Sequence, residues 1–131
     1  MSKLALHMTG CGFVDDTDIM QIGLEDDDYY IVAQKLQELL KWWEVCTKVS
    51  GGAIVPEKGW YGLVSFELVV GEWSYGTNLE DAEVTGKNMQ GTTAQLKFLD
   101  LHEAKKMLGV FLAIDGNNTT QVTHMRRTAE E

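Results

Sequence analysis

The pattern of apolar and polar positions along the chain predicts one long helix among several short strands. Apolar side chains recur every three or four residues from Val32 to Trp43, which places them on one face of an α-helix. Acidic residues precede this segment and a Gly-Gly pair follows it, so we expect a helix over residues 28–48. Elsewhere, short apolar runs bounded by turn residues are typical of β-strands.

A hairpin is expected near the N-terminus. Residues 8–22 have strand-like composition, which the pair Asp15-Asp16 interrupts. Further along, aromatic and β-branched residues over 60–69 predict a strand that turns at Gly71 into a second strand.

The second half of the chain is less regular. Residues 76–92 are polar and contain glycines, so a loop is expected there, followed by a strand over 94–99. Asp100 and Glu103 have the spacing of a capping box, which predicts a short helix. The expected elements are a hairpin (8–22), a helix (28–48), strands with a hairpin (53–75), a loop, short helix and strand (76–114), and a helix that stops without a C-cap (118–131).

Length and composition place these elements in one α+β domain over residues 1–131, with 44% apolar residues. No apolar run reaches the roughly 18 residues of a membrane span, and no secretory signal is recognisable. We therefore expect no membrane association and an intracellular protein, in the cytoplasm or nucleus. The formal net charge of −9 is opposite to that of most stand-alone nucleic-acid binders. Nucleic-acid binding by this chain alone is not expected.

Asp15 and Asp16 are the candidate metal ligands. Adjacent aspartates on a tight hairpin can hold Mg²⁺ against a phosphate, because this ion takes one or two carboxylates plus water and substrate oxygens. Two such ions about 3.5–4 Å apart can activate an attacking hydroxyl and stabilise the leaving oxygen. The alternative is a solvated acidic turn, which the dipeptide alone favours, since aspartate is common in turns.

The residues around this pair resemble the reverse transcriptases of retrotransposons. Phe13-Val14-Asp15-Asp16 matches the aromatic-x-Asp-Asp motif of that family. A helix rich in Leu and Trp, a Gly-Gly turn and Val55-Pro56-Glu57-Lys58 follow in the family's order. Leu108-Gly109-Val110 resembles a strand that lies near the primer. The resemblance spans about residues 10–131, with an unusual stretch at 60–100 that is known from a group of retrotransposon polyproteins.

The resemblance implies an RNA-directed DNA polymerase, a nucleotidyltransferase that uses two metal ions. Asp15 and Asp16 would be catalytic and would bind Mg²⁺ (or Mn²⁺). Lys58 would act as general acid on the departing pyrophosphate, with a surface lysine as the alternative. Gly109 would allow close backbone approach to the primer, with a plain core strand as the alternative. The fold would be the C-terminal part of a polymerase palm, and the full-length family binds an RNA or DNA template-primer and dNTP.

This chain departs from the family in its carboxylates. A palm needs a third carboxylate on an earlier strand, and the 14 residues before Asp15 contain no Asp or Glu. We therefore expect a fragment without fingers and thumb that is inactive alone. Two alternatives stay open. One is a non-catalytic remnant that self-associates through an exposed sheet edge. The other is a small α+β interaction domain with an incidental acidic turn.

Overall fold

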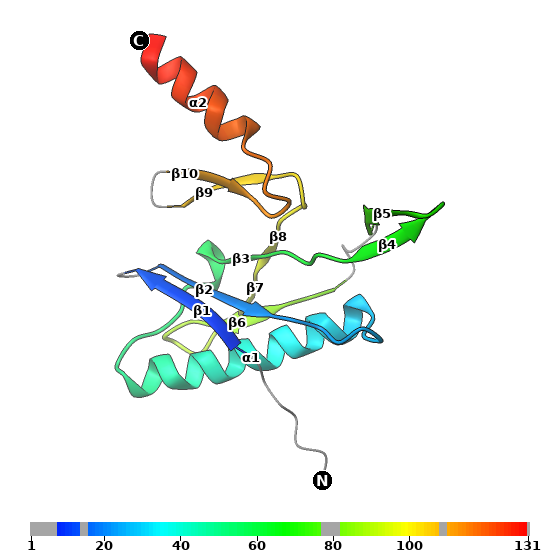
Figure 1. Ribbon diagram of the computed structural model, residues 1–131. Coiled ribbons are helices and arrows are strands. Elements are labelled where there is room, and N and C mark those ends of the chain that lie inside the picture. Colours follow the sequence, from blue (N-terminus) through cyan, green and yellow to red (C-terminus); the bar gives the residue numbers. More distant parts are fainter. Residues whose placement is uncertain (1–7, 14–15, 77–81, 108–109, 131) are drawn as a thin grey trace. The chain divides into compact units, whose positions relative to one another are not determined.

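The computed structural model describes residues 8–13, 16–76, 82–107 and 110–130 (Figure 1). Within these residues lie two α-helices, one 3₁₀ turn and ten short strands that pair two by two. The predicted α+β class, with one long helix and further antiparallel strands, is confirmed.

The chain divides into two compact units. Unit 1 comprises Met1–Tyr61 and Asn78–Lys97, and unit 2 comprises Gly62–Thr77 and Phe98–Glu131. The single domain expected from the chain length stays a prediction. The elements of unit 1 are β1 (Met8–Phe13), β2 (Asp16–Gln21), α1 (Tyr29–Val49), η1 (Pro56–Lys58), β3 (Trp60–Tyr61), β6 (Thr85–Lys87) and β7 (Thr93–Gln95). Those of unit 2 are β4 (Phe66–Val69), β5 (Glu72–Tyr75), β9 (Ala104–Met107), β10 (Val110–Ala113) and α2 (Thr119–Glu130), while β8 (Lys97–Phe98) crosses the boundary.

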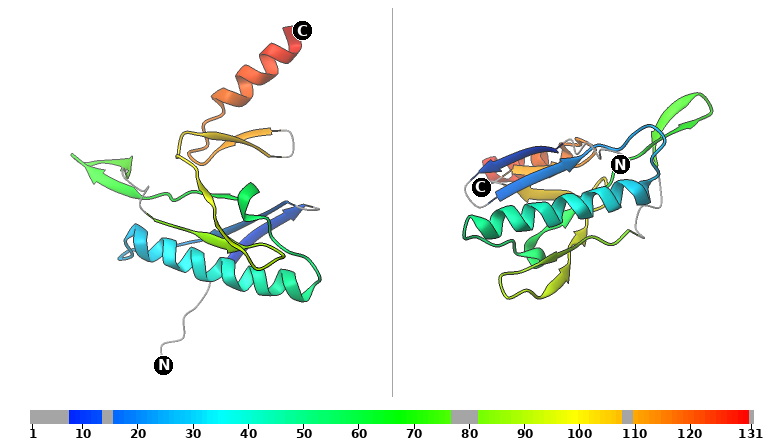
Figure 2. Two further views of the ribbon diagram at one scale, coloured as in Figure 1. Left: turned by 180° about the vertical axis from the view of Figure 1, so that it is seen from behind. Right: turned by 90° about the horizontal axis from the view of Figure 1, so that it is seen from below.

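β1 and β2 form an antiparallel hairpin, as the sequence predicts. The register places Met8 opposite Gln21 and Phe13 opposite Asp16. The connection is therefore two residues long, which is the commonest length for a β-hairpin. β2 contacts α1, and the views from different directions show the hairpin running beside that helix (Figure 2).

α1 spans Tyr29–Val49, which confirms the helix predicted over 28–48. The Asp28 side chain caps its N-terminus by accepting a hydrogen bond from the Ile31 N–H at 2.9 Å. A cap of this kind contributes about 1 kcal/mol to stability. Just beyond the other end, Gly51 adopts φ +86°, a left-handed conformation that glycine reaches without strain. The apolar face of the helix buries Ala33, Leu39 and Leu40.

A β-hairpin occupies part of the loop predicted over 76–92, so that prediction is wrong for β6. Gly86 lies opposite Ala94 in the β6–β7 pair. A Cβ atom on Gly86 would lie 2.8 Å from Ile54 Cδ1 and 3.1 Å from Pro56 Cγ. The glycine that indicates a loop in the sequence instead permits close packing against the strand.

The strand predicted over 94–99 is split into β7 and β8. The Leu96 N–H donates to the Val84 carbonyl at 2.9 Å, whereas the Lys97 N–H donates to the Gly59 carbonyl at 3.4 Å. Successive amides therefore pair with different segments of unit 1. β7 pairs with β6, whereas β8 pairs with β3.

In unit 2, β4 and β5 form the hairpin predicted around Gly71. The continuous strand predicted over 60–69 is wrong at 62–65, because β4 begins only at Phe66. A Cβ atom on Gly62 would lie 1.9 Å from Ile114 Cδ1. The backbone at this glycine packs closely against that side chain instead of continuing the strand.

The short helix predicted at Asp100 is also wrong, because a turn leads into β9 there. The Asp100 Oδ1 accepts a hydrogen bond from the His102 N–H at 3.0 Å, and the Glu103 N–H donates to the Asp100 carbonyl at 3.0 Å. Aspartate favours such local turns, which compete with helix initiation. The following residues pair in register with β10, Ala104 opposite Ala113. The strand predicted at the end of the 76–114 stretch is present as β10 (Val110–Ala113), while Leu108 and Gly109 lie outside the described residues.

α2 spans Thr119–Glu130 and confirms the helix predicted over 118–131. The Gln121 Oε1 accepts the Phe111 N–H at 2.8 Å, and the rings of Phe111 and His124 meet edge to face with centroids 5.2 Å apart. These contacts hold α2 against β10.

Candidate functional site

Of the predicted aspartate pair, the structure describes Asp16 and places it in a strand, where the sequence predicts a turn. Asp16 is the first residue of β2 and lies opposite Phe13. Asp15 lies outside the described residues. The register makes residues 14 and 15 the connection between the strands, so the predicted hairpin is confirmed and the metal-binding role of the pair stays a prediction.

The donor chemistry of this pair suits Mg²⁺, which prefers carboxylate oxygens. A two-metal centre needs more ligands than two side chains provide. Among the described residues, no three His, Cys, Asp or Glu side chains gather closely enough to hold a metal ion. The described part of the chain thus supplies no complete metal centre.

The acidic run before α1 is used to build the fold. Asp27 Oδ2 accepts the Leu24 N–H at 2.8 Å and pairs with the Lys35 ammonium at 2.5 Å. The hydrogen bond from Lys35 and that from the Leu24 backbone lower the pKa of Asp27, because both stabilise the carboxylate. This carboxylate fixes the entry into the helix.

Lys58 is the last residue of η1 and is exposed. Its backbone N–H donates to the Val55 carbonyl at 3.0 Å, and η1 packs against β6 and β7. Within the described residues, no ion pair of its ammonium group is found. Lys58 and Asp16 both belong to unit 1.

Two side chains of α1 bind the backbone of β6, and we call them the helix–strand clamp: Gln37 and Glu44. The Gln37 Oε1 accepts the Thr85 N–H at 2.7 Å, and its Nε2 donates to the Thr85 carbonyl at 2.8 Å. Glu44 Oε1 accepts the Lys87 N–H at 2.8 Å. The amide of Gln37 therefore takes the place of a neighbouring strand.

The β6–β7 register explains why Thr85 and Lys87 are available to the clamp. The Leu96 N–H donates to the Val84 carbonyl, and the Asn88 N–H donates to the Thr92 carbonyl. In an antiparallel pair, every second residue of a strand bonds to the partner strand. The backbone groups of Thr85 and Lys87, which alternate with the bonded positions, therefore point away from β7. On β6 that outer side faces α1.

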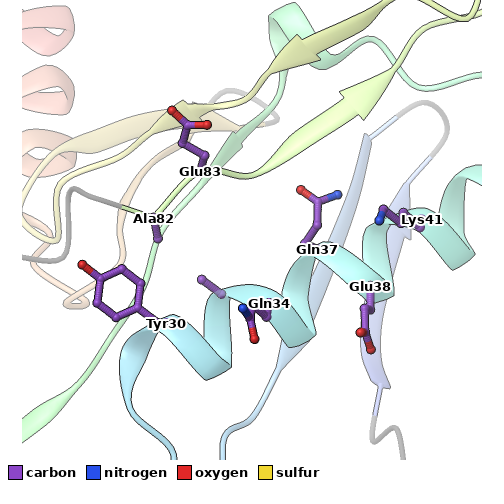
Figure 3. Close-up of a pocket in the computed structure, with 8 residues that line it drawn as sticks. Tyr30, Gln34, Gln37, Glu38, Lys41, Ala82 and Glu83 are labelled. Atoms are coloured by element: carbon purple, nitrogen blue, oxygen red, sulfur yellow. The ribbon is translucent and has the colours of Figure 1, made fainter.

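A shallow groove of about 550 Å³ runs along α1 beside the residues that precede β6 (Figure 3). Figure 3 shows the Gln37 amide directed towards the strand and the Glu38 carboxylate directed away from it. The Tyr61 hydroxyl donates a hydrogen bond to the carbonyl of Ala82, a residue of the groove lining. Burial raises the pKa of Tyr61, and the Glu83 carboxylate makes a smaller contribution in the same direction. The lining is mostly polar and carries no Ser, Cys or His nucleophile or base: it consists of Tyr30, Ala33, Gln34, Gln37, Glu38, Lys41, Ala82 and Glu83.

Unit 2 holds a separate ionisable pair. His102 Nδ1 lies 2.7 Å from Asp115 Oδ2, and Asp115 Oδ1 accepts the Asn117 N–H at 2.8 Å. The Asp115 N–H donates in turn to the Leu101 carbonyl at 3.2 Å. The pair ties the turn before β9 to the turn after β10, so its position indicates a structural role.

The clamp residues were not among the sequence-predicted sites. Ala33, Gln37, Leu40 and Glu44 follow the three- and four-residue spacing of one helix face, and two of the four are buried apolar residues. A polar residue inside such a stripe indicates a specific buried partner. That signal was available, but the identity of the partner was not.

Comparisons with known proteins found no matching family model, no similar curated protein and no similar solved structure. In the part of the chain that the structure describes, neither helix is long and apolar enough to cross a membrane.

Proposed function

We propose that this chain is the C-terminal part of the palm of a retrotransposon reverse transcriptase, an RNA-directed DNA polymerase. The observation that carries the proposal is the register of β1 with β2, which leaves residues 14 and 15 as a two-residue connection and begins β2 at Asp16. Asp16 then begins β2 beside this connection, and the resemblance expects the motif aspartates at such a hairpin.

Two features of unit 1 support this proposal. β2 packs against the long helix α1, which gives the hairpin a rigid base. Lys58 follows in a proline-initiated turn that packs against β6 and β7. In the proposed role, Asp15 and Asp16 bind Mg²⁺ (or Mn²⁺), and Lys58 places a positive charge near a phosphate. The bound ion would neutralise phosphate charge and activate a hydroxyl.

The same proposal holds that the chain alone is inactive as a polymerase. The net charge of −9 disfavours nucleic-acid binding by the chain. An incomplete carboxylate set binds Mg²⁺ weakly and does not align two ions.

Paramagnetic broadening tests the metal role directly. Added Mn²⁺ should broaden the backbone resonances of β1 and β2 nearest the turn, and Asp15→Asn should abolish the effect. The control is Asp26→Asn, which removes an exposed carboxylate from the neighbouring acidic run and should leave the broadening intact. Broadening that survives Asp15→Asn, or that Asp26→Asn removes equally, would contradict the site.

Primer extension tests the inactivity. The purified chain should extend no primer on an RNA template with Mg²⁺ or Mn²⁺. Extension that is lost in Asp16→Asn would show that the chain does assemble a catalytic centre, for example between copies.

A second candidate function is a small interaction domain in which the acidic turn is incidental. The observation that favours it is the exposed apolar face of the β4–β5 hairpin, which no metal chemistry requires. This candidate predicts no site-specific Mn²⁺ broadening at the hairpin turn.

A further inference from the structure

The β4–β5 hairpin of unit 2 has one apolar face. Cross-strand partners point to the same side of a sheet, so Phe66 with Tyr75 and Leu68 with Trp73 share a face. The rings of Phe66 and Tyr75 have centroids 5.2 Å apart. These side chains are nevertheless exposed to solvent: Phe66 61%, Leu68 60%, Trp73 72% and Tyr75 39%. Isolated exposed apolar residues are ordinary, but four on one face are typical of a contact surface.

The edges of the same hairpin are suited to pairing with a further strand. The Gly76 N–H donates to the Ser65 carbonyl at 2.8 Å, which makes this a hydrogen-bonded position of the ladder. Hydrogen-bonded positions alternate along an antiparallel pair. Four residues therefore direct their backbone groups away from the partner strand: Phe66 and Leu68 on β4, and Trp73 and Tyr75 on β5. The residues that form the apolar face thus also offer edge hydrogen bonds. In the described residues β4 and β5 form a sheet of only two strands, and such a hairpin is marginally stable alone in water.

The charge on the other face of the hairpin favours one class of partner. Glu67 and Glu72 lie on the opposite face of the hairpin, and residues 62–76 contain no Lys, Arg or His. A nucleic acid would be repelled by these carboxylates. A second copy of the chain brings the same two carboxylates and a net charge of −9 of its own, which disfavours pairing between identical edges. A basic polypeptide strand meets both the apolar face and the carboxylates favourably.

We propose that the β4–β5 hairpin is a docking site for an extended segment of another protein that alternates apolar and basic residues. The segment adds a strand at a hairpin edge, its apolar side chains cover Leu68 and Trp73, and its Lys or Arg side chains meet Glu67 and Glu72. Main-chain hydrogen bonds supply affinity in this mode, and the alternate side chains supply specificity. The proposal does not depend on polymerase ancestry.

The test uses two fluorescein-labelled nine-residue peptides, one alternating Val with Lys and one alternating Val with Glu. Fluorescence anisotropy with the full chain at low salt should give a Kd for the Lys peptide about tenfold lower than for the Glu peptide, and added salt should weaken the Lys peptide. Trp73→Ser and Leu68→Ser should each weaken Lys-peptide binding about tenfold, because the bound peptide would cover these two apolar side chains. Two such variants guard against one that disturbs the hairpin.

Trp42→Ser is the matched control, because Trp42 is a tryptophan of α1 with similar exposure, 61%. It should leave the Kd within about twofold, a change below 0.5 kcal/mol. The double variant Glu67→Gln with Glu72→Gln should retain binding but lose the preference for the Lys peptide.

Four outcomes would overturn the proposal. The first is that the two peptides bind equally well to the unmodified chain, and the second is that Trp42→Ser weakens binding as much as Trp73→Ser does. The third is a dimer in sedimentation that Trp73→Ser dissociates while peptide binding is unaffected, which would assign the face to self-association. The fourth is binding of a single-stranded oligonucleotide that Trp73→Ser abolishes, which would assign the face to nucleic acid.

Discussion

Gln37→Glu is the sharpest test of the helix–strand clamp. The substitution keeps the size of the side chain and retains an oxygen that can accept the Thr85 N–H. It replaces the Nε2 donor by a second oxygen, which would face the Thr85 carbonyl at the 2.8 Å spacing of the present hydrogen bond. One hydrogen bond becomes a repulsive contact in a partly buried position.

The expected loss follows from that exchange. A net hydrogen bond is worth about 1 kcal/mol, and leaving a buried carbonyl unpaired costs about 1–3 kcal/mol. We therefore expect Gln37→Glu to lower the free energy of unfolding by about 2 kcal/mol, which is about a 30-fold change in the folding equilibrium constant. Urea denaturation followed by circular dichroism measures this loss.

Gln34→Glu is the matched control, because Gln34 is exposed and lies one turn away on the same helix. It makes the same change of charge and should alter stability by less than about 0.5 kcal/mol. The difference between the two variants should shrink when the new carboxyl becomes protonated below about pH 4, since a protonated carboxyl can donate again. Equal stabilities of Gln37→Glu and Gln34→Glu at pH 7 would refute the clamp.

Three further predictions concern the turns and packing of both units. Val70 adopts φ +51° at the β4–β5 turn and is 99% exposed, so Val70→Asn should stabilise unit 2 by about 1 kcal/mol in thermal unfolding, because Asn tolerates the left-handed region and no contact is lost. A destabilised Val70→Asn protein would contradict that reading. Gly86→Ala should destabilise unit 1 by about 1–3 kcal/mol in urea, since its Cβ would meet Ile54, whereas Thr93→Ala at an exposed position of β7 should have little effect. The Asn117 N–H and then the His102 side chain lower the pKa of Asp115. A lowered folded pKa stabilises the protein above the unfolded value of about 3.9, and this stabilisation is lost as the pH falls through the folded pKa, so Asp115→Asn should flatten the acid limb of a stability-versus-pH curve. An unchanged acid limb would argue against the lowered pKa.

Local sequence signals predict an element well where the element is stabilised by its own residues. α1 has an apolar stripe, an Asp28 cap and Gly51 beyond its end, and all three signals lie in the helix or within two residues of it. The β1–β2 and β4–β5 hairpins are likewise recognisable, because each strand pairs with a neighbour in sequence.

The same signals fail where contacts with residues far away in the sequence determine the local structure. The capping-box spacing of Asp100 and Glu103 is real, yet residues 104–107 gain more by pairing with β10 than by continuing as a helix. Gly86 reads as a loop residue, yet it is the residue that allows β6 to pack against Ile54 and Pro56.

The candidate sites also differ in how far local sequence patterns predict them. The β1–β2 hairpin was predictable, because its two strands are neighbours in the sequence, although Asp16, which the sequence places in the turn, begins β2. The clamp was not, since Gln37 and Thr85 lie 48 positions apart. The exposed face of β4–β5 was hidden for a related reason: alternation predicts that one face is apolar, but whether other residues cover it depends on the rest of the fold.

The sequence by itself thus determined the long helix α1 and the β1–β2 and β4–β5 hairpins, because hydrogen bonds and caps between near neighbours stabilise these features. Only the tertiary structure decided which strands pair with one another, which polar side chains of α1 bind β6, and which apolar side chains stay exposed. Those outcomes depend on contacts between residues far apart in the chain, whose free energy no local window contains.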